Sequence, residues 1–79
     1  MAVVIPLRFA DAEPARRDRI VRLLRDEGIE VRRSTVEELG ELYLMRAGVP
    51  VDPVRRSVTD LLERNVPGWQ DDLEIYWPA

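Results

Sequence analysis

The sequence predicts an α+β fold: a small single domain over residues 1–79, with a core of three helices and two or three short strands. The chain has 79 residues, of which 46% are hydrophobic and 34% charged, as in a globular domain. At this length only about 60% of the unfolded chain's surface can be buried, which leaves room for one domain. Apolar residues alternate near both ends of the chain, whereas the middle carries them at helical spacing.

The N-terminal segment, residues 1–10, is expected to form a strand. From Ala2 to Phe9 the odd positions are apolar and face one side, while Val4, Pro6 and Arg8 face the other. Pro6 has no backbone N–H. This strand therefore either lies at the edge of its sheet or turns the Pro6 side away from a partner.

A helix is predicted for residues 15–27, because Ile20, Leu23 and Leu24 form a narrow apolar stripe along it. Gly28 follows, and glycine favours the left-handed conformation that ends many helices. The remaining surface carries five arginines, interrupted by aspartates at helical spacing from them. A solvated face laced with salt bridges is favoured here over a phosphate-binding surface.

Residues 29–33 alternate and are expected to form a brief strand. Strand, helix and strand in succession also permit a β-α-β unit, although this helix is short for the crossover. The topology stays open between a winged-helix arrangement and a small sheet covered on one face.

The segment 34–65 is expected to form two helices joined by a Gly-Val-Pro-Val corner, a helix-turn-helix-like unit. Ser34 precedes Glu37 by three residues, the spacing at which side chains and amides cap each other at a helix start. Gly48 is expected to end the first helix. Asp52, followed by a proline, supplies an N-cap oxygen for the second helix, residues 53–65.

The first of these helices carries more apolar surface than one stripe requires. Leu42, Leu44 and Met45 lie outside the stripe, so this helix is either central in the core or in contact with another chain. In the second case we expect a homodimer, or an obligate partner, through residues 42–45.

The C-terminal segment, residues 66–79, is expected to form a turn and a strand. Val66-Pro67-Gly68 is typical of a turn, and Asp71 and Asp72 are expected in a turn as well. Residues 73–77 alternate like a strand. We expect this strand to lie near the N-terminal one, because each is too short to be stable alone.

The composition excludes several functions. The chain has no Cys and no His, and all twelve of its basic residues are Arg. Thiolate, imidazole and Schiff-base lysine chemistry are thereby ruled out. No catalytic residue, metal ligand or cofactor is predicted. Neither a membrane span nor a signal peptide is recognised, so a cytoplasmic protein is expected.

Four stretches, RRDRIVRLLRDEGIEV, STVEELGEL, GVPVD and VRRSVTDLLERN, resemble winged helix-turn-helix DNA-binding domains of the sugar-operon repressor and arginine repressor kind. The resemblance covers about residues 16–77. It implies a small DNA-associated regulator that binds duplex DNA. It also implies that residues 71–77 belong to the wing and that base and phosphate contacts come from Arg55, Arg56, Ser57 and Thr59.

The charge balance keeps an alternative open. The formal net charge is −3 and the calculated pI about 4.9, whereas nucleic-acid-binding proteins usually have a basic balance. The alternative is an acidic protein–protein interaction module, such as an antitoxin, a phage-type inhibitor or an assembly adaptor, that meets a basic protein partner. Its expected interface residues are Leu42, Leu44, Met45, Trp69 and Trp77.

Overall fold

Seven elements follow one another in the computed structural model, which describes residues 1–9, 12–36 and 40–78. They are β1 (Ala2–Phe9), α1 (Pro14–Asp26), β2 (Glu30–Val36), β3 (Gly40–Gly48), α2 (Asp52–Asn65), α3 (Trp69–Asp72) and β4 (Leu73–Ile75). The expected α+β single domain is confirmed.

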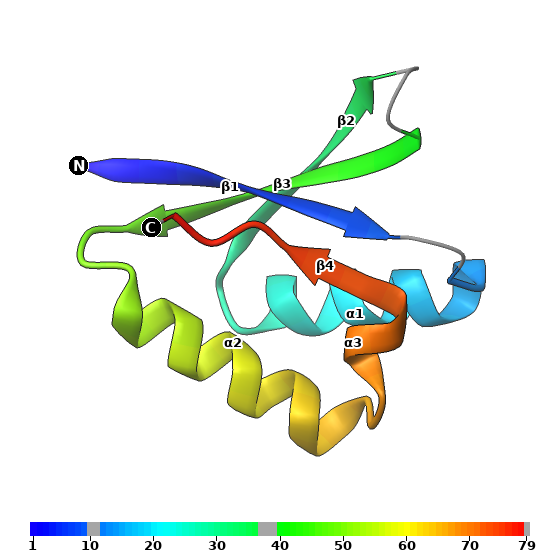
Figure 1. Cartoon of the computed structure of the whole chain (residues 1–79). Coiled ribbons are helices and arrows are strands. Elements are labelled where there is room, and N and C mark those ends of the chain that lie inside the picture. The colour runs from blue at the N-terminus through cyan, green and yellow to red at the C-terminus, as the bar shows by residue number, and fades with distance from the viewer. Residues whose placement is uncertain (10–11, 37–39, 79) are drawn as a thin grey trace.

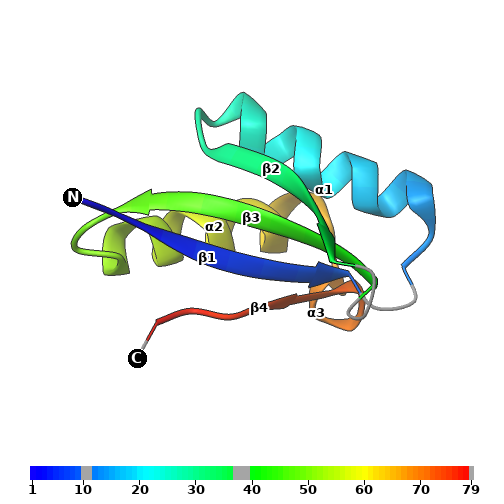
Figure 2. The ribbon, with the colours of Figure 1, turned by 90° about the horizontal axis from the view of Figure 1, so that it is seen from above.

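The four strands form one antiparallel sheet in the order β2-β3-β1-β4. β1 and β2 are each antiparallel to β3, so they run parallel to each other on either side of it. This split β-α-β arrangement is the topology of ferredoxin-like domains. The helices lie on one side of the sheet (Figure 1), and the strands lie in front of α2 in the view from above (Figure 2). Of the two topologies that the sequence left open, the sheet covered on one face is the one found.

Local sequence patterns explain three of the elements. In β1 the odd positions Ile5, Leu7 and Phe9 are buried, as their alternation predicted. The helix expected over residues 15–27 is α1, which has a proline in its first turn. Gly28 follows α1 with φ +83°, the left-handed conformation expected of it. α2 likewise matches the helix expected over residues 53–65.

The helix expected to end at Gly48 is wrong, because residues 40–48 form strand β3. The helix-turn-helix-like unit expected over residues 34–65 therefore lacks its first helix, and α2 follows a strand. β3 is apolar on both sides, with Tyr43 and Met45 toward the helices and Leu44 on the opposite side. The cap expected at Glu37 and its neighbours lies outside the described residues.

Further expectations are corrected. The described residues form four strands instead of two or three, and β1 lies inside the sheet, which excludes the edge-strand alternative for Pro6. The Pro6 carbonyl points away from β3 toward Tyr76, in line with the other alternative. Asp52 is the first residue of α2, and no described side chain caps that helix start. The turn expected at Asp71 is the short helix α3, which begins after Gly68, and β4 ends at Ile75. β1 and β4 do pair, as expected.

The core lies between the sheet and the two longer helices. Its fully buried side chains are Ile5, Leu7, Ile20, Leu24, Met45, Val58 and Leu62, which come from β1, α1, β3 and α2. Phe9 and Tyr43 pack edge to face in the same layer, with ring centroids 5.3 Å apart. One apolar layer thus joins the two longer helices to the sheet and leaves the opposite face of the sheet uncovered by helices.

Candidate functional site

The four residues expected to contact DNA lie on α2. Arg55, Arg56 and Ser57 are exposed, and Thr59 is half-buried. The Arg55 guanidinium carbon lies 5.8 Å from the ring centroid of Trp77, a distance at which a cation and an aromatic ring attract. A shallow recess of about 530 Å³ is lined by Asp52, Arg55, Arg56, Thr59 and Asp60. Its two carboxylates would repel a phosphate backbone.

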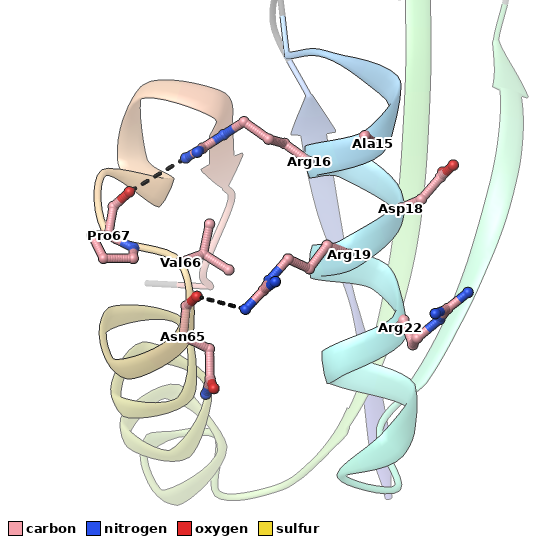
Figure 3. Close-up of a pocket in the computed structure, with 8 residues that line it drawn as sticks. All are labelled: Ala15, Arg16, Asp18, Arg19, Arg22, Asn65, Val66 and Pro67. Atoms are coloured by element: carbon pink, nitrogen blue, oxygen red, sulfur yellow. Dashed lines mark hydrogen bonds between the residues drawn. The ribbon is translucent and has the colours of Figure 1, made fainter.

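The arginines of α1 are engaged mainly within the chain. Arg16 donates from Nε to Asp72 Oδ2 at 2.6 Å and from Nη2 to the Pro67 carbonyl oxygen at 3.3 Å. Arg19 donates to the Asn65 carbonyl oxygen at 3.2 Å. Figure 3 shows both side chains crossing from α1 toward the turn after α2. They thus tie α1 to the carboxyl end of α2, where the helix dipole favours positive charge.

Arg25 also fastens α1 to a neighbouring element, at the other end of the helix. Its Nε and Nη2 both donate to the Val31 carbonyl oxygen, at 3.2 and 2.9 Å, and so hold the helix end against β2. Arg22 makes no hydrogen bond or ion pair within the described ranges. Arg22 also lines the recess of about 670 Å³ beside Arg16 and Arg19, but in Figure 3 its side chain points away from Asn65. Arg16, Arg19 and Arg25 therefore fasten α1 to its neighbours.

The five residues expected at a protein interface divide between the core and the surface. Met45 is 0% exposed and Trp69 is 8% exposed, so both belong to the core. Trp77 is half-buried on the helix side of the sheet, beneath Arg55. Leu42 and Leu44 remain as surface candidates. They lie side by side along β3, on the side of the sheet opposite the helices.

We call that side the open face. The alternation of the strands gives it the side chains of Val4, Pro6, Arg8, Glu30, Arg32, Ser34, Leu42, Leu44, Arg46, Glu74 and Tyr76, with the small Ala2 at its end. The centre is apolar: Pro6 lies opposite Leu44, and Leu42 follows along β3. Val4 is 60% exposed and Tyr76 43% exposed. A recess of about 200 Å³ opens beside Val4 and Leu44.

Charged residues border this apolar centre. Glu30 forms ion pairs with Arg32 at 2.7 Å and with Arg46 at 3.9 Å along one margin. At the opposite margin Arg8 faces Glu74 across the strands, and Glu74 accepts a hydrogen bond from the Tyr76 hydroxyl at 3.1 Å. Three arginines and two glutamates leave the open face close to neutral.

Sequence reasoning located part of this face and missed the rest. It named Leu42 and Leu44, although it placed them on a helix. It also put Val4 and Pro6 together with Arg8 on the second side of their strand, but it did not treat that side as a binding surface. Tyr76 was missed altogether. The available signal was two apolar residues, Val4 and Pro6, on the side of an amphipathic strand that should be polar.

Other kinds of site find no support in the described ranges. These ranges contain no group of three or more acidic side chains placed to hold a metal ion. None of the helices in them has the length and apolar character needed to cross a bilayer. In comparisons with known proteins, no family model, no curated sequence and no solved structure matches this chain.

Proposed function

We propose that this chain is a small protein-interaction module that binds another polypeptide with the open face of its sheet. The observation that carries the proposal is the apolar centre of that face. An antiparallel sheet with one face in water normally presents polar side chains there. Here both inner strands present apolar ones instead, with Val4 and Pro6 on β1 and Leu42 and Leu44 on β3.

The pattern of this face also supports a protein partner over a nucleic acid. Proteins that bind RNA on a sheet stack its bases on aromatic side chains of the inner strands. The inner positions Val4, Pro6, Leu42 and Leu44 are aliphatic. Five charged side chains of nearly balanced sign surround them, so the face lacks the positive field that phosphates require. Apolar contact at the centre with polar contact at the rim is typical of protein interfaces.

The DNA-associated regulator is the less well supported function. Arg55 and Arg56 are exposed and could reach phosphates, but Asp52 and Asp60 lie in the same shallow recess. A recognition helix is normally held across the groove by a preceding helix. Here the element before α2 is strand β3. The sequence also suggested a basic protein partner. The open face does not support it, because arginines outnumber glutamates there.

Site-specific photo-crosslinking tests the proposal. A photoreactive amino acid replaces Leu44 on the open face or, as a control, Glu63 on the exposed side of α2. Irradiated in cells that carry the gene, the protein labelled at position 44 should cross-link to another polypeptide, and the protein labelled at position 63 should not. No polypeptide adduct from position 44, or equal adducts from both positions, would reject the proposal.

DNA retention provides the second arm of this experiment. At low salt the purified protein should not retard random duplex DNA. The opposite result would favour the regulator if Arg55→Ala/Arg56→Ala weakened binding by roughly 1 to 3 kcal/mol per lost contact. The binding should in that case fall steeply with added salt, because each neutralised phosphate releases counterions.

A further inference from the structure

We infer that the polypeptide on the open face is a second copy of this chain, so that two sheets stack face to face in a homodimer. The inference rests on the proposed function, because it names the partner of the same surface. Three properties of the face support it: the order of its side chains, its charge and its size.

The strand register arranges the open face in three rows that run across the sheet. The first row reads Glu74, Arg8, Leu42, Ser34 from β4 to β2. In the second row the order is Tyr76, Pro6, Leu44, Arg32, with Tyr76 placed by the hydrogen bond that its backbone N–H donates to the Pro6 carbonyl oxygen. The third row begins at β1 and reads Val4, Arg46, Glu30.

In the dimer we infer, a twofold axis lies between the two stacked sheets, parallel to the strands and level with the midpoint between β1 and β3. The rotation places β1 over the second copy's β3 and β4 over its β2, so each row faces the same row in reverse order. Pro6 then meets the second copy's Leu44, and Tyr76 meets the second copy's Arg32, a favourable aromatic–cation pair. Glu74 meets the second copy's Ser34, which can donate a hydrogen bond to it. Arg8 meets the second copy's Leu42, and Arg46 meets its Val4, so no charge lies directly opposite a like charge. Stacked sheets pack about 10 Å apart and within about 30° of each other, and long side chains can span the shifts at the corners.

The charge of the face suits a copy of itself better than a strongly charged partner. Glu30 already holds Arg32 and Arg46 in ion pairs, so these two arginines keep local compensation in the dimer. With three arginines and two glutamates, two copies meet with little net repulsion. A partner of high charge of either sign would find no matching field on this surface.

The size of the face lies at the low end of specific protein interfaces. β1 has eight residues, and at about 3.3 Å per residue it is roughly 26 Å long. Four strands spaced by about 4.8 Å are roughly 19 Å wide. The plane thus covers roughly 500 Å², and projecting side chains enlarge its accessible surface. A standard protein interface buries about 800 Å² on each partner.

Sedimentation equilibrium of the purified chain from about 1 to about 100 µM gives the first test. We expect a mass of twice 9.2 kDa at the upper concentrations. Leu44→Glu should raise the dimer dissociation constant by at least about tenfold, because it buries an unpaired charge at the centre. Val49→Glu is the matched control, since Val49 is 55% exposed and lies beyond β3, off the open face. Its dissociation constant should stay at the wild-type value.

A charge exchange tests the orientation of the two copies. Ser34→Glu places a carboxylate opposite the second copy's Glu74 and should weaken the dimer. Adding Glu74→Arg should restore it, because each new carboxylate at position 34 would then face an arginine of the other copy. Within one chain the two positions lie three strand spacings apart, roughly 14 Å, too far for a direct contact. Restoration by the double variant therefore reports a contact between copies.

The outcomes separate this inference from the proposed function. A wild-type chain that stays monomeric at the highest concentration, or a dimer that Leu44→Glu and Val49→Glu affect equally, overturns the homodimer. If the photoreactive residue at position 44 then cross-links to a different protein, the proposed function stands and only the identity of the partner changes. A dimer broken by Leu44→Glu, but with no rescue of Ser34→Glu by Glu74→Arg, overturns the stated axis and with it the inference.

Discussion

The amide of Tyr76 donates a hydrogen bond to the carbonyl oxygen of Pro6 at 3.0 Å, at the point where the sheet ends beside β4. Residues that face each other in this way normally exchange two hydrogen bonds. Pro6 has no N–H and cannot return the second one. The proline therefore leaves one rung of the β1–β4 ladder incomplete, next to Ile75, where β4 ends. In Figure 2 the chain beyond β4 runs away from β1.

Pro6→Val should complete this rung. The new amide at position 6 would point toward the Tyr76 carbonyl, and a net gain of about 0.5–1.5 kcal/mol is typical of one hydrogen bond. Loss of the proline's rigidity costs about 0.4–1 kcal/mol, so the free energy of unfolding should change little. Hydrogen exchange followed by NMR is the sensitive measurement, and the new amide should be protected. Exchange at the rate of a free amide would show that the rung does not form.

The alternation along β3 predicts that two neighbouring residues differ sharply in their contribution to stability. Met45 is fully buried beneath the helices, whereas Leu44 is half-buried on the open face. Met45→Ala should lower the free energy of unfolding by about 2–5 kcal/mol. That is a large share of the roughly 4–12 kcal/mol expected for 79 residues. Leu44→Ala should cost about 1 kcal/mol or less.

Urea unfolding of the dilute, monomeric chain measures both costs, and it should be followed by circular dichroism. Val3→Ala serves as a further control, because Val3 is half-buried at the start of β1, away from the centre of the core. Equal losses for Met45→Ala and Leu44→Ala would be inconsistent with a strand that has one buried and one open side.

The error at β3 has a physical cause. β3 is apolar on both of its faces, so its sequence lacks the alternation of apolar and polar residues by which strands are recognised. A run of Leu and Met of this kind resembles a helix. One sign favoured a strand: Gly40 is unfavourable inside a helix by about 1 kcal/mol. Whether residues 40–48 become a strand depends on β1 and β2 being available to pair with them, which is a property of distant segments.

Elements with local signals were predicted well. β1 alternates cleanly, α1 begins at Pro14 and ends before Gly28, and α2 follows an Asp-Pro start. The candidate site was only partly predictable, because the open face exists only once the strand order is known. Val4 and Tyr76 are 72 positions apart in the sequence, and nothing local indicates that they share a surface.

The contact between Arg16 and Asp72 predicts a measurable coupling between α1 and α3. The Arg16 Nε–Asp72 Oδ2 distance is 2.6 Å, and the carboxylate is mostly buried while the arginine side chain is more exposed. Allowing for that exposure, we expect a coupling free energy of about 0.5–1.5 kcal/mol. A double-mutant cycle with Arg16→Ala and Asp72→Ala, measured by urea unfolding, isolates it.

Arg22→Ala is the matched control for this cycle. Arg22 lies on the same helix and makes no hydrogen bond or ion pair with any described residue, so its replacement should change stability by less than about 0.5 kcal/mol. If Arg22→Ala and Arg16→Ala cost the same, helix propensity or net charge accounts for the loss. The fastening role of Arg16 would then be rejected.

The indole nitrogen of Trp69 is a buried donor. Trp69 is 8% exposed, and its Nε1 has no hydrogen-bond partner among the described residues. A buried unpaired donor costs about 1–3 kcal/mol. Trp69→Phe removes this donor together with part of the ring, so the lost packing should be largely offset and stability should fall by no more than about 1 kcal/mol. Trp69→Ala removes the whole side chain and should cost about 3–5 kcal/mol.

Thermal and urea unfolding monitored by circular dichroism compare the two variants without relying on tryptophan fluorescence, to which Trp77 also contributes. A loss well above 2 kcal/mol for Trp69→Phe would mean that Nε1 has a partner in solution, since removing a satisfied donor adds its bond to the lost packing. A loss near zero, with the full loss for Trp69→Ala, would mean that the indole acts through its apolar surface alone.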